Sequence, residues 1–326
     1  MIRAVWGIDT SNYRTSLAAV RLEDGGILMN ERLLLPVAAG ERGLRQSEAV
    51  FAHLKQVAGL ERALRKPAES GAIPVAVAVS DRPRDGADSY MPVFQAGVTL
   101  AVLLSAALNI PLFRTTHQRG HLAAAARGTG LAEAESYLAL HLSGGTTDLL
   151  AVTPEKIERI GGSMDLHAGQ LVDRVGVALG LSFPSGPELE CLAEKGESTG
   201  KLGASMAGED LFCHFSGAES QAQRWILNGT AAPEDLAREV YDLLARSTAR
   251  MLRAGRKRTG MKRALITGGV ASSALYRRLL TERCAALREA PEPVFGDPAL
   301  SGDNAVGTAL IGRQKVLKTD GREEKK

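Results

Sequence analysis

Two histidines, His117 and His121, stand four residues apart in the segment HQRGHLAAAA. On a helix, residues at i and i+4 lie on one face, so both imidazoles can bind one metal ion. A carboxylate as third ligand would leave positions open for substrate, and Asp303, at the start of the last expected helix, is a candidate. A chain with six histidines can contain such a spacing by chance. The alternative to a metal site is therefore a pair of partly exposed helix histidines without a ligand. For Asp303 the alternative is a helix N-cap.

Three turns rich in glycine, serine and threonine each follow a strand-like apolar run. They span residues 7–17 (GIDTSNYRTSL), 142–150 (LSGGTTDLL) and 266–273 (ITGGVASS). Such turns expose backbone N–H groups that suit phosphate oxygens, and the hydroxyls of Ser143 and Thr146 would add donors. A single turn of this kind is more often structural. Three in corresponding places favour a nucleotide site.

A further polar group surrounds the segment AGQLVDRVGVALGL and the turn FPSGPELE that follows it. The helix pattern is apolar on one face, and Asp173 lies within it. Its carboxylate could accept hydrogen bonds from ribose hydroxyls, although a surface helix charge is the default interpretation. Gly186 and Glu190 extend the same possible pocket.

Strands and helices alternate along the elements that carry these residues. The first 35 residues predict strands joined at Asp24-Gly25-Gly26, a hairpin signal. Residues 74–80 predict a buried strand, 94–108 a mostly buried helix, and 109–115 a strand leading into HQRGH. The pattern restarts at residue 136, where SYLALHLSGGTTDLLAVT predicts two strands across a Gly-Gly turn.

This duplication predicts an α/β fold of two similar lobes with a nucleotide cleft between them. A length of 326 residues suits two domains. We expect an N-terminal lobe at 1–134, a C-terminal lobe at 135–300, a final helix at 301–312 that closes the cleft, and a charged tail at 313–326. Neither GxGxxG after a first strand nor GxxxxGK[ST] occurs, which excludes the usual dinucleotide and phosphate-loop patterns.

The composition of the chain argues against several other classes of protein. Forty basic and 37 acidic residues give a net charge of +3, too balanced for a general nucleic-acid coat. Residues 250–263 are locally basic, either as a solvated helix end or as an RNA-facing patch. Three cysteines without CxxC argue against disulfides or a thiolate zinc site. Without a signal-like start or an apolar run of about 20 residues, we expect a soluble, cytoplasmic protein and no membrane partner.

The motifs also occur in an order that resembles one family. The order GIDTS, HQRGH, LSGGTTDL, AGQLVDRV, GLSFPSGP, CHFSG, ITGGVASS and GDNA, from about residue 5 to 312, is similar to the TsaD family. These are tRNA threonylcarbamoyladenosine synthases, long labelled M22 glycoproteases. The resemblance implies the two-lobed actin/Hsp70/sugar-kinase ATPase fold. A peptidase is disfavoured because HQRGH lacks the glutamate of HExxH.

The resemblance also implies functional residues and cofactors. The family's metal ligands fall on His117, His121 and Asp303, which would hold a divalent ion, iron or zinc. The second cofactor would be an adenine nucleotide, either threonylcarbamoyl-AMP or ATP/ADP. The expected nucleotide and substrate residues are His141, Leu142, Ser143, Gly144, Gly145, Asp173, Gly186, Glu190, Gly268, Gly269 and Ser273.

Several positions depart from the family pattern. The family usually reads ETSCDET near its start, and this chain reads DTSNYRT, with Tyr13 and Arg14 in place of an acidic pair. Thr146 replaces the histidine of SGGHT, and Ser273 replaces an asparagine. The Tyr-Arg pair reverses the local charge, so an anionic intermediate could bind there but no carboxylate can act as base. These departures are typical of a divergent paralogue.

The function implied by the resemblance is metal-dependent transfer of threonylcarbamoyl from threonylcarbamoyl-AMP to adenosine in tRNA. Its partners would be tRNA and the family's partner proteins in a hetero-oligomer. Two alternatives remain open, because a fold does not fix a function. One is a regulatory or scaffold paralogue that binds nucleotide and metal without transfer, and the other is a small-molecule carbamoyl or phosphoryl transferase.

Overall fold

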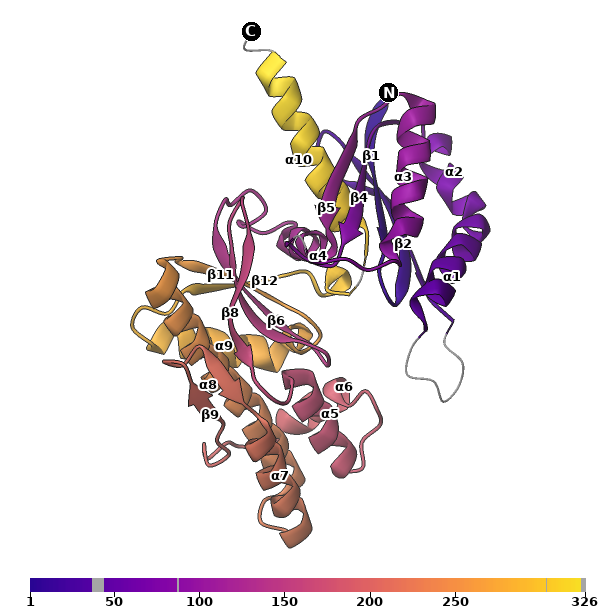
Figure 1. The fold of residues 1–326 in the computed structure, drawn as a ribbon. Coiled ribbons are helices and arrows are strands. Elements are labelled where there is room, and N and C mark those ends of the chain that lie inside the picture. Colours follow the sequence, from indigo (N-terminus) through magenta and orange to yellow (C-terminus); the bar gives the residue numbers. More distant parts are fainter. Residues whose placement is uncertain (37–43, 87, 303, 324–326) are drawn as a thin grey trace. The chain divides into compact units, whose positions relative to one another are not determined.

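The chain folds into two compact units in the computed structural model, which describes residues 1–36, 44–86, 88–302 and 304–323. Unit 1 comprises Met1–Arg127 and Gly302–Lys326, and unit 2 comprises Gly128–Ser301 (Figure 1). The chain therefore leaves unit 1 after Arg127 and returns to it at Gly302.

Unit 1 is built on a mixed five-stranded sheet in the order β3-β2-β1-β4-β5. β1 pairs antiparallel with β2 and parallel with β4, and β4 pairs parallel with β5. The carboxyl ends of β1, β4 and β5 therefore meet at one edge of the sheet. The strands are β1 (Ile2–Thr10), β2 (Arg14–Arg21), β3 (Ile27–Leu34), β4 (Ala72–Arg82) and β5 (Leu112–Thr116).

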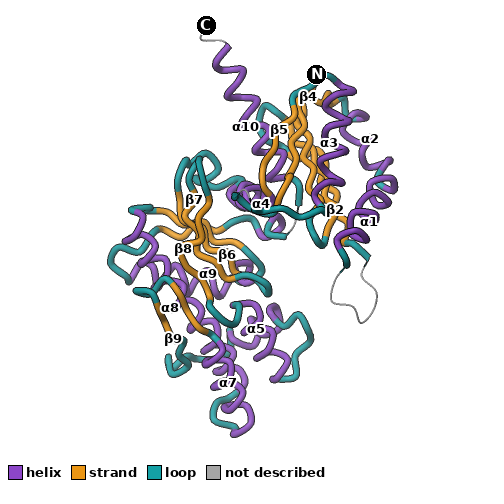
Figure 2. Tube along the Cα trace, in the orientation of Figure 1, coloured by secondary structure: helices purple, strands orange, loops and turns teal. Residues whose placement is uncertain are grey.

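Helices cover both faces of this sheet (Figure 2). Successive residues of β1 point to opposite faces, and Ile8 contacts α3 whereas Gly7 contacts α10. The core on the α3 side contains Ile8, Val79 and Ala101. The helices are α1 (Gln46–Gly59), α2 (Glu61–Glu69), α3 (Phe94–Leu108), α4 (His117–Ala126) and α10 (Val306–Glu323).

Two observations concern the last helix. The segment that we expected to be a charged tail from residue 313 is helical as far as Glu323, and Val316 within it is buried. α10 also lies very close to α4, because a Cβ on Gly307 would come within 1.8 Å of the carbonyl oxygen of Gly120. The absence of a side chain at Gly307 thus lets α4 pack directly on the first turn of α10.

Unit 2 is built on a seven-stranded sheet in the order β12-β11-β6-β7-β8-β10-β9. The predicted hairpin around the Gly-Gly turn is confirmed: β6 and β7 pair antiparallel, with Leu142 opposite Thr147. β11 pairs parallel with both β6 and β12, so these three strands end at one edge. The strands are β6 (Tyr137–Leu142), β7 (Thr147–Val152), β8 (Ile157–Ser163), β9 (Ser205–Ala207), β10 (Phe212–His214), β11 (Arg263–Thr267) and β12 (Glu292–Phe295).

The helices of unit 2 pack around the long helix α8, whose inner face is buried over most of its length. Leu140, Leu244 and Tyr276 belong to the same core, which therefore joins the sheet to α8 and α9. Among the described residues, no helix has the combined length and apolar character needed to cross a membrane. The helices are α5 (Ala168–Ala178), α6 (Gly186–Ala193), α7 (Ser216–Asn228), α8 (Pro233–Thr259), α9 (Ala274–Ala286), η1 (Val270–Ser272) and η2 (Pro298–Leu300).

Candidate functional site

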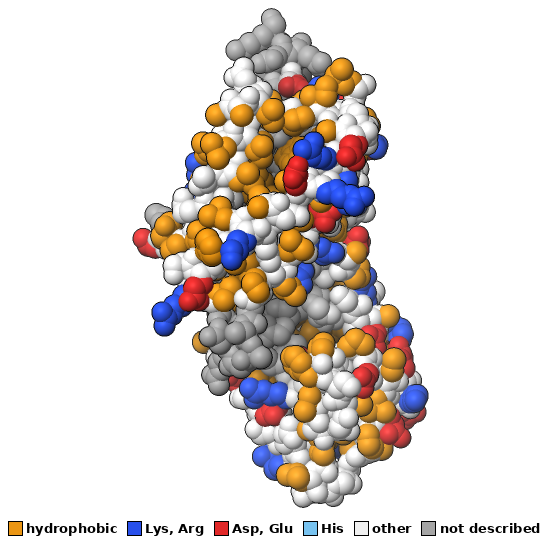
Figure 3. Space-filling model, turned by 90° about the vertical axis from the view of Figure 1, so that its right-hand side faces the viewer, with side chains coloured by type: hydrophobic (Ala, Val, Ile, Leu, Met, Phe, Trp, Pro, Cys, Tyr) orange, Lys and Arg blue, Asp and Glu red, His pale blue; other side chains and the backbone are white. Residues whose placement is uncertain are grey.

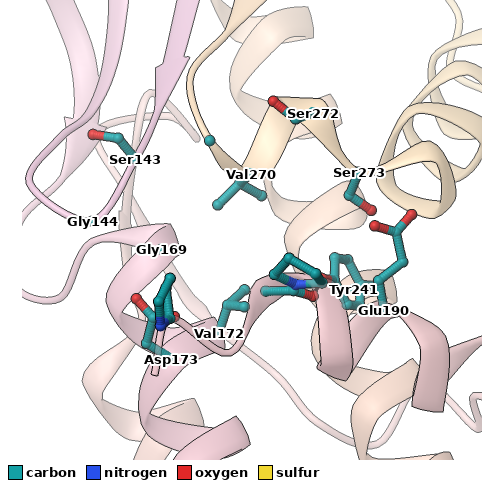
Figure 4. A pocket seen from close by; sticks show the side chains of 14 residues that line it. Ser143, Gly144, Gly169, Val172, Asp173, Glu190, Tyr241, Val270, Ser272 and Ser273 are labelled. Carbon is teal, nitrogen blue, oxygen red and sulfur yellow. Dashed lines mark hydrogen bonds between the residues drawn. The ribbon is translucent and has the colours of Figure 1, made fainter. Parts of the chain in front are cut away.

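A pocket of about 400 Å³ lies in unit 2 (Figure 4). It is formed where the turns after β6 and β11 face α5, α6 and α8. The lining residues are Ser143, Gly144, Gly169, Val172, Asp173, Pro184, Gly186, Pro187, Glu190, Tyr241, Gly269, Val270, Ser272 and Ser273.

The turn after β6 is held against the start of α5 by a close backbone approach. The N–H of Gly169 donates to the carbonyl of Ser143 at 3.1 Å, and the N–H of Ala168 donates to Thr147 Oγ1 at 2.8 Å. A Cβ on Gly169 would lie only 2.5 Å from the backbone nitrogen of Gly144. Any side chain at this position would therefore push the turn away from α5.

Asp173 connects α5 to the turn that begins α6. Its Oδ1 accepts a hydrogen bond from the backbone N–H of Ser185 at 2.8 Å. On the other side of the same turn, the hydroxyl of Tyr241 donates to the carbonyl of Gly186 at 3.0 Å. One wall of the pocket is thus held by two side chains from different helices, of which one is a carboxylate at the pocket surface.

Glu190, Ser273 and Tyr241 lie together at another part of the pocket (Figure 4). Ser273 caps α9 by accepting from the N–H of Tyr276 at 3.1 Å, and Glu190 accepts from the N–H of Leu275 at 2.9 Å. Burial, and then the neighbouring Glu190 carboxylate, raises the pKa of Tyr241. Its hydroxyl therefore stays protonated and remains a hydrogen-bond donor at neutral pH.

The structure brings most of the expected nucleotide residues into this pocket. Those that line it are Ser143, Gly144, Asp173, Gly186, Glu190, Gly269 and Ser273. Those that are not among its lining residues are His141, Leu142, Gly145 and Gly268.

Packing explains why Leu142 and Gly268 do not line the pocket. The Leu142 side chain is fully buried in the core of unit 2. Gly268 has φ +104°, and a Cβ there would lie 2.2 Å from the carbonyl oxygen of Leu142. This glycine is needed for the turn after β11 to approach β6, which is a structural requirement next to the pocket.

Several lining residues were not singled out from the sequence. Gly169 lies four residues before Asp173 in α5 and is therefore on the same face of that helix. Val172 lies directly before Asp173. Extending that face from Asp173 would have indicated Gly169. Tyr241 lies in the middle of α8, where no local motif marks it, so only the folded chain reveals it.

The two histidines of unit 1 meet on one face of α4. Their Nε2 atoms are 3.0 Å apart, and the ring planes are nearly perpendicular at 84°. His117 Nδ1 lies 2.9 Å from Asp9 Oδ2 and 3.1 Å from Oδ1. Asp9 stands near the end of β1 and is only 1% exposed. A buried carboxylate therefore holds one imidazole from behind.

This donor set fits a divalent cation. The two Nε2 atoms lie 3.0 Å apart, a distance that allows an N–H···N hydrogen bond between the rings and is also short enough for both nitrogens to bind one ion at about 2.1 Å. Imidazole nitrogens suit zinc and iron. Asp303 lies outside the described residues. Within the ranges that the structure describes, no group of three histidine, cysteine or acidic side chains is placed to hold a metal.

The positions that depart from the family pattern have different surroundings. Tyr13 is exposed, and Arg14 begins β2 at the edge where β1 ends. A guanidinium nitrogen of Arg14 lies 3.7 Å from where a Cβ on Gly302 would stand. The carbonyl of Thr146 accepts from the N–H of Ser143 within the hairpin turn. Arg14 thus brings a positive charge to the loop that precedes α10.

The locally basic run at the end of α8 is partly neutralised within unit 2. Arg250 forms a bidentate pair with Asp210, and Arg258 lies 3.6 Å from Glu158. Arg256 donates to the carbonyl of Ala290. These contacts favour the interpretation of a helix end over a dedicated RNA surface.

The fold and the pocket define the class of protein. The structure resembles HypF of T. kodakarensis, with a TM-score of 0.57 and 15% identity over 97% of this chain and 48% of that chain. It also resembles a ROK family glucokinase from Streptomyces griseus, with a TM-score of 0.52 and 13% identity over 95% and 99% of the two chains. These likenesses confirm the predicted α/β fold of the sugar-kinase class.

Sequence comparison then identifies the family. The TsaD family, described as tRNA N6-adenosine threonylcarbamoyltransferase, matches residues 90–309. The Bacillus subtilis protein of that name is 32% identical over 324 residues, covering 94% of this chain and 89% of that protein. A Thermus thermophilus protein of the same name is 33% identical over 318 residues, covering 95% and 91%. The chain belongs to the TsaD family, as its motif order predicts.

Proposed function

We propose that this protein is a metal-dependent transferase that moves threonylcarbamoyl from threonylcarbamoyl-AMP to N6 of an adenosine in tRNA. The names of its relatives support the reaction class. The observation that carries the proposal is the joint presence of two sites: a pocket with Asp173 and Glu190 at its surface, and two imidazole nitrogens spaced for one cation.

The adenosine part of the donor would bind in the unit 2 pocket. Asp173 and Glu190 supply carboxylate oxygens that suit ribose hydroxyls. In the turn after β6, the Ser143 hydroxyl and the backbone N–H of Gly144 suit phosphate oxygens. The Tyr241 hydroxyl stabilises the wall by its hydrogen bond to Gly186.

Bond changes in the transfer are simple. The exocyclic amine of adenosine attacks the carbamoyl carbon, and a C–N bond forms as the C–O bond to phosphate breaks. AMP leaves, and the proton of the amine passes to the leaving phosphate or to water. Held by His117, His121 and Asp303, an iron or zinc ion would supply Lewis-acid stabilisation of phosphate or carbamoyl oxygens. The positive charge of Arg14 would suit an anionic threonylcarbamoyl donor such as threonylcarbamoyl-AMP. Neither residue 13 nor residue 14 is a carboxylate that could take the proton.

Partners follow from the same proposal. A tRNA substrate places the reaction in the cytoplasm, and backbone electrostatics would contribute to its binding. Partner proteins would need a docking surface, and α1 and α3 of unit 1 expose Phe51, Leu54, Val102 and Leu103. Hydrophobic side chains are numerous on the side of unit 1 shown in Figure 3. An exposed apolar surface of this kind is typical of protein interaction sites.

The test supplies the purified protein with zinc or iron, threonylcarbamoyl-AMP and unmodified tRNA, and analyses the nucleosides by mass spectrometry. Threonylcarbamoyl on adenosine supports the proposal. Nucleotide binding without product would instead support a regulatory or scaffold protein. Product on a small acceptor in place of tRNA would support a small-molecule transferase.

A further inference from the structure

We propose that Asp9 is a positioning residue for the histidine pair: its buried carboxylate accepts the Nδ1–H of His117 and thereby directs Nε2 of that ring to the cation. The inference rests on the proposed function in taking the histidine pair as a metal site. It adds a residue from a different element, β1, to the pair on α4.

The hydrogen bond determines the tautomer. A neutral imidazole carries one N–H, and a carboxylate can only accept. With both oxygens of Asp9 within 3.1 Å of Nδ1, the proton of His117 is placed on Nδ1. Nε2 then bears the lone pair, and it is this atom that lies 3.0 Å from Nε2 of His121. Carboxylate–histidine–metal arrangements use this geometry to orient the ring and raise its basicity.

The surroundings make this contact rigid. Asp9 lies in β1, which is paired with β2 on one side and β4 on the other, so its backbone cannot shift alone. Phe94 packs beside the His117 ring, with centroids 6.1 Å apart. The α4 helix is itself held by the close approach of Gly120 and Gly307.

A carboxylate that is 1% exposed also needs a partner of its own, because burial without compensation is costly. The Asp9–His117 contact joins residues 108 positions apart and thus ties the end of β1 to the start of α4. A purely structural role is satisfied by this hydrogen bond alone. A positioning role also requires that the cation bind more weakly when the carboxylate is removed from a protein that still folds, and this difference can be measured.

The experiment uses the full-length, metal-free protein. Long-range ¹⁵N–¹H NMR correlations of the histidine rings, with His117 assigned through His117→Gln, report which nitrogen is protonated. We expect the Nδ1–H form in the wild type and a shift towards Nε2–H in Asp9→Ala. Titration with Co²⁺, followed by visible absorption, should show about 10- to 100-fold weaker binding in Asp9→Ala. Asp9→Asn, which keeps a neutral acceptor, should lose less.

Asp81→Ala is the matched control. Its side chain is 9% exposed, lies at the end of β4 in the same unit, and pairs with Arg82 and Arg114. We expect Co²⁺ affinity within about twofold of the wild type. If Asp9→Ala does not fold, Asp9→Asn and the wild-type tautomer still decide the question.

An Nε2–H tautomer of His117 in the wild type would overturn the inference, and so would unchanged Co²⁺ affinity in folded Asp9→Ala. A wild-type protein that binds no Co²⁺ would overturn the metal part of the proposed function. In that case the tautomer measurement by itself tests only the hydrogen bond between Asp9 and Nδ1 of His117.

Discussion

The two candidate sites of this protein are built in different ways. In unit 1 a few side chains make the site, and their relation depends on one long-range contact between Asp9 and His117. In unit 2 the pocket is lined by residues from several turns and helices, and Gly169 allows the turn after β6 to lie directly against α5. We therefore expect removal of a single functional group to abolish metal binding in unit 1. In unit 2, we expect a larger side chain in place of a glycine to weaken nucleotide binding.

The two sites also differ in the kind of ligand that their groups suit. Imidazoles and a buried carboxylate are groups that hold a cation and define a tautomer. Small-residue turns and peripheral carboxylates are groups that bind a nucleotide without reacting with it. Substitutions of the two histidines or of Asp9 should therefore change metal content, and substitutions around the pocket should change nucleotide affinity.

The largest expected effect is the loss of metal in His117→Ala. Removing one of two nitrogens that are 3.0 Å apart should reduce bound zinc from about one ion per chain towards zero, because one imidazole binds weakly by itself. Elemental analysis after dialysis measures this directly. Nucleotide affinity should stay within about twofold, and equal zinc in variant and wild type would refute the ligand assignment.

Gly169→Ala should have the next largest effect, on the other site. Its Cβ would lie 2.5 Å from the nitrogen of Gly144, so the turn must move and the affinity for AMP should fall by at least about tenfold. Isothermal titration calorimetry with AMP provides the measurement. Gly217→Ala is the matched control, because a Cβ there meets nothing within 4 Å. Equal affinities in the two variants would contradict the account of the pocket.

Asp165 should make unit 2 sensitive to acid. Burial alone would raise the pKa of Asp165, but hydrogen bonds from Ser216, Leu166 and Phe215 hold it at about 2. A depressed pKa stabilises the fold above the unfolded value of about 4, and this contribution is lost as the pH falls towards 2. Thermal melts should show that Asp165→Asn lowers the melting temperature at pH 7 and flattens its dependence between pH 4 and 2. An unchanged pH profile would speak against this role.

Tyr241→Phe should give the smallest effect. The variant keeps the buried ring but loses the hydrogen bond to the carbonyl of Gly186, worth about 1 kcal/mol. We expect about a three- to tenfold loss of AMP affinity, measured as for Gly169→Ala, with metal content unchanged. If affinity does not fall, the Tyr241 hydroxyl is not needed to hold the wall of the pocket.

Sequence patterns predicted the local parts of this structure well. The hairpin of β6 and β7 followed from two apolar runs across a Gly-Gly turn, and His117 and His121 lie on one face of a helix, as their spacing predicts. Asp173 and Glu190 were selected from their surroundings in the sequence, and both line the pocket.

What could not be predicted depends on contacts between distant segments. Asp9 meets His117 only because β1, β4 and β5 end at one edge, and strand order is not contained in local periodicity. Tyr241 reaches the pocket from the middle of α8. The helical continuation of α10 to Glu323 was missed because its charged sequence resembles a solvated tail, although Val316 is buried.

The central claim is that both sites serve one transfer reaction, and product formation on tRNA tests it most directly. Wild-type protein loaded with zinc or iron should convert adenosine in tRNA to its N6-threonylcarbamoyl form when given threonylcarbamoyl-AMP, whereas His117→Ala should form little or none. Wild-type protein that binds both metal and AMP and yet modifies no tRNA would contradict the account.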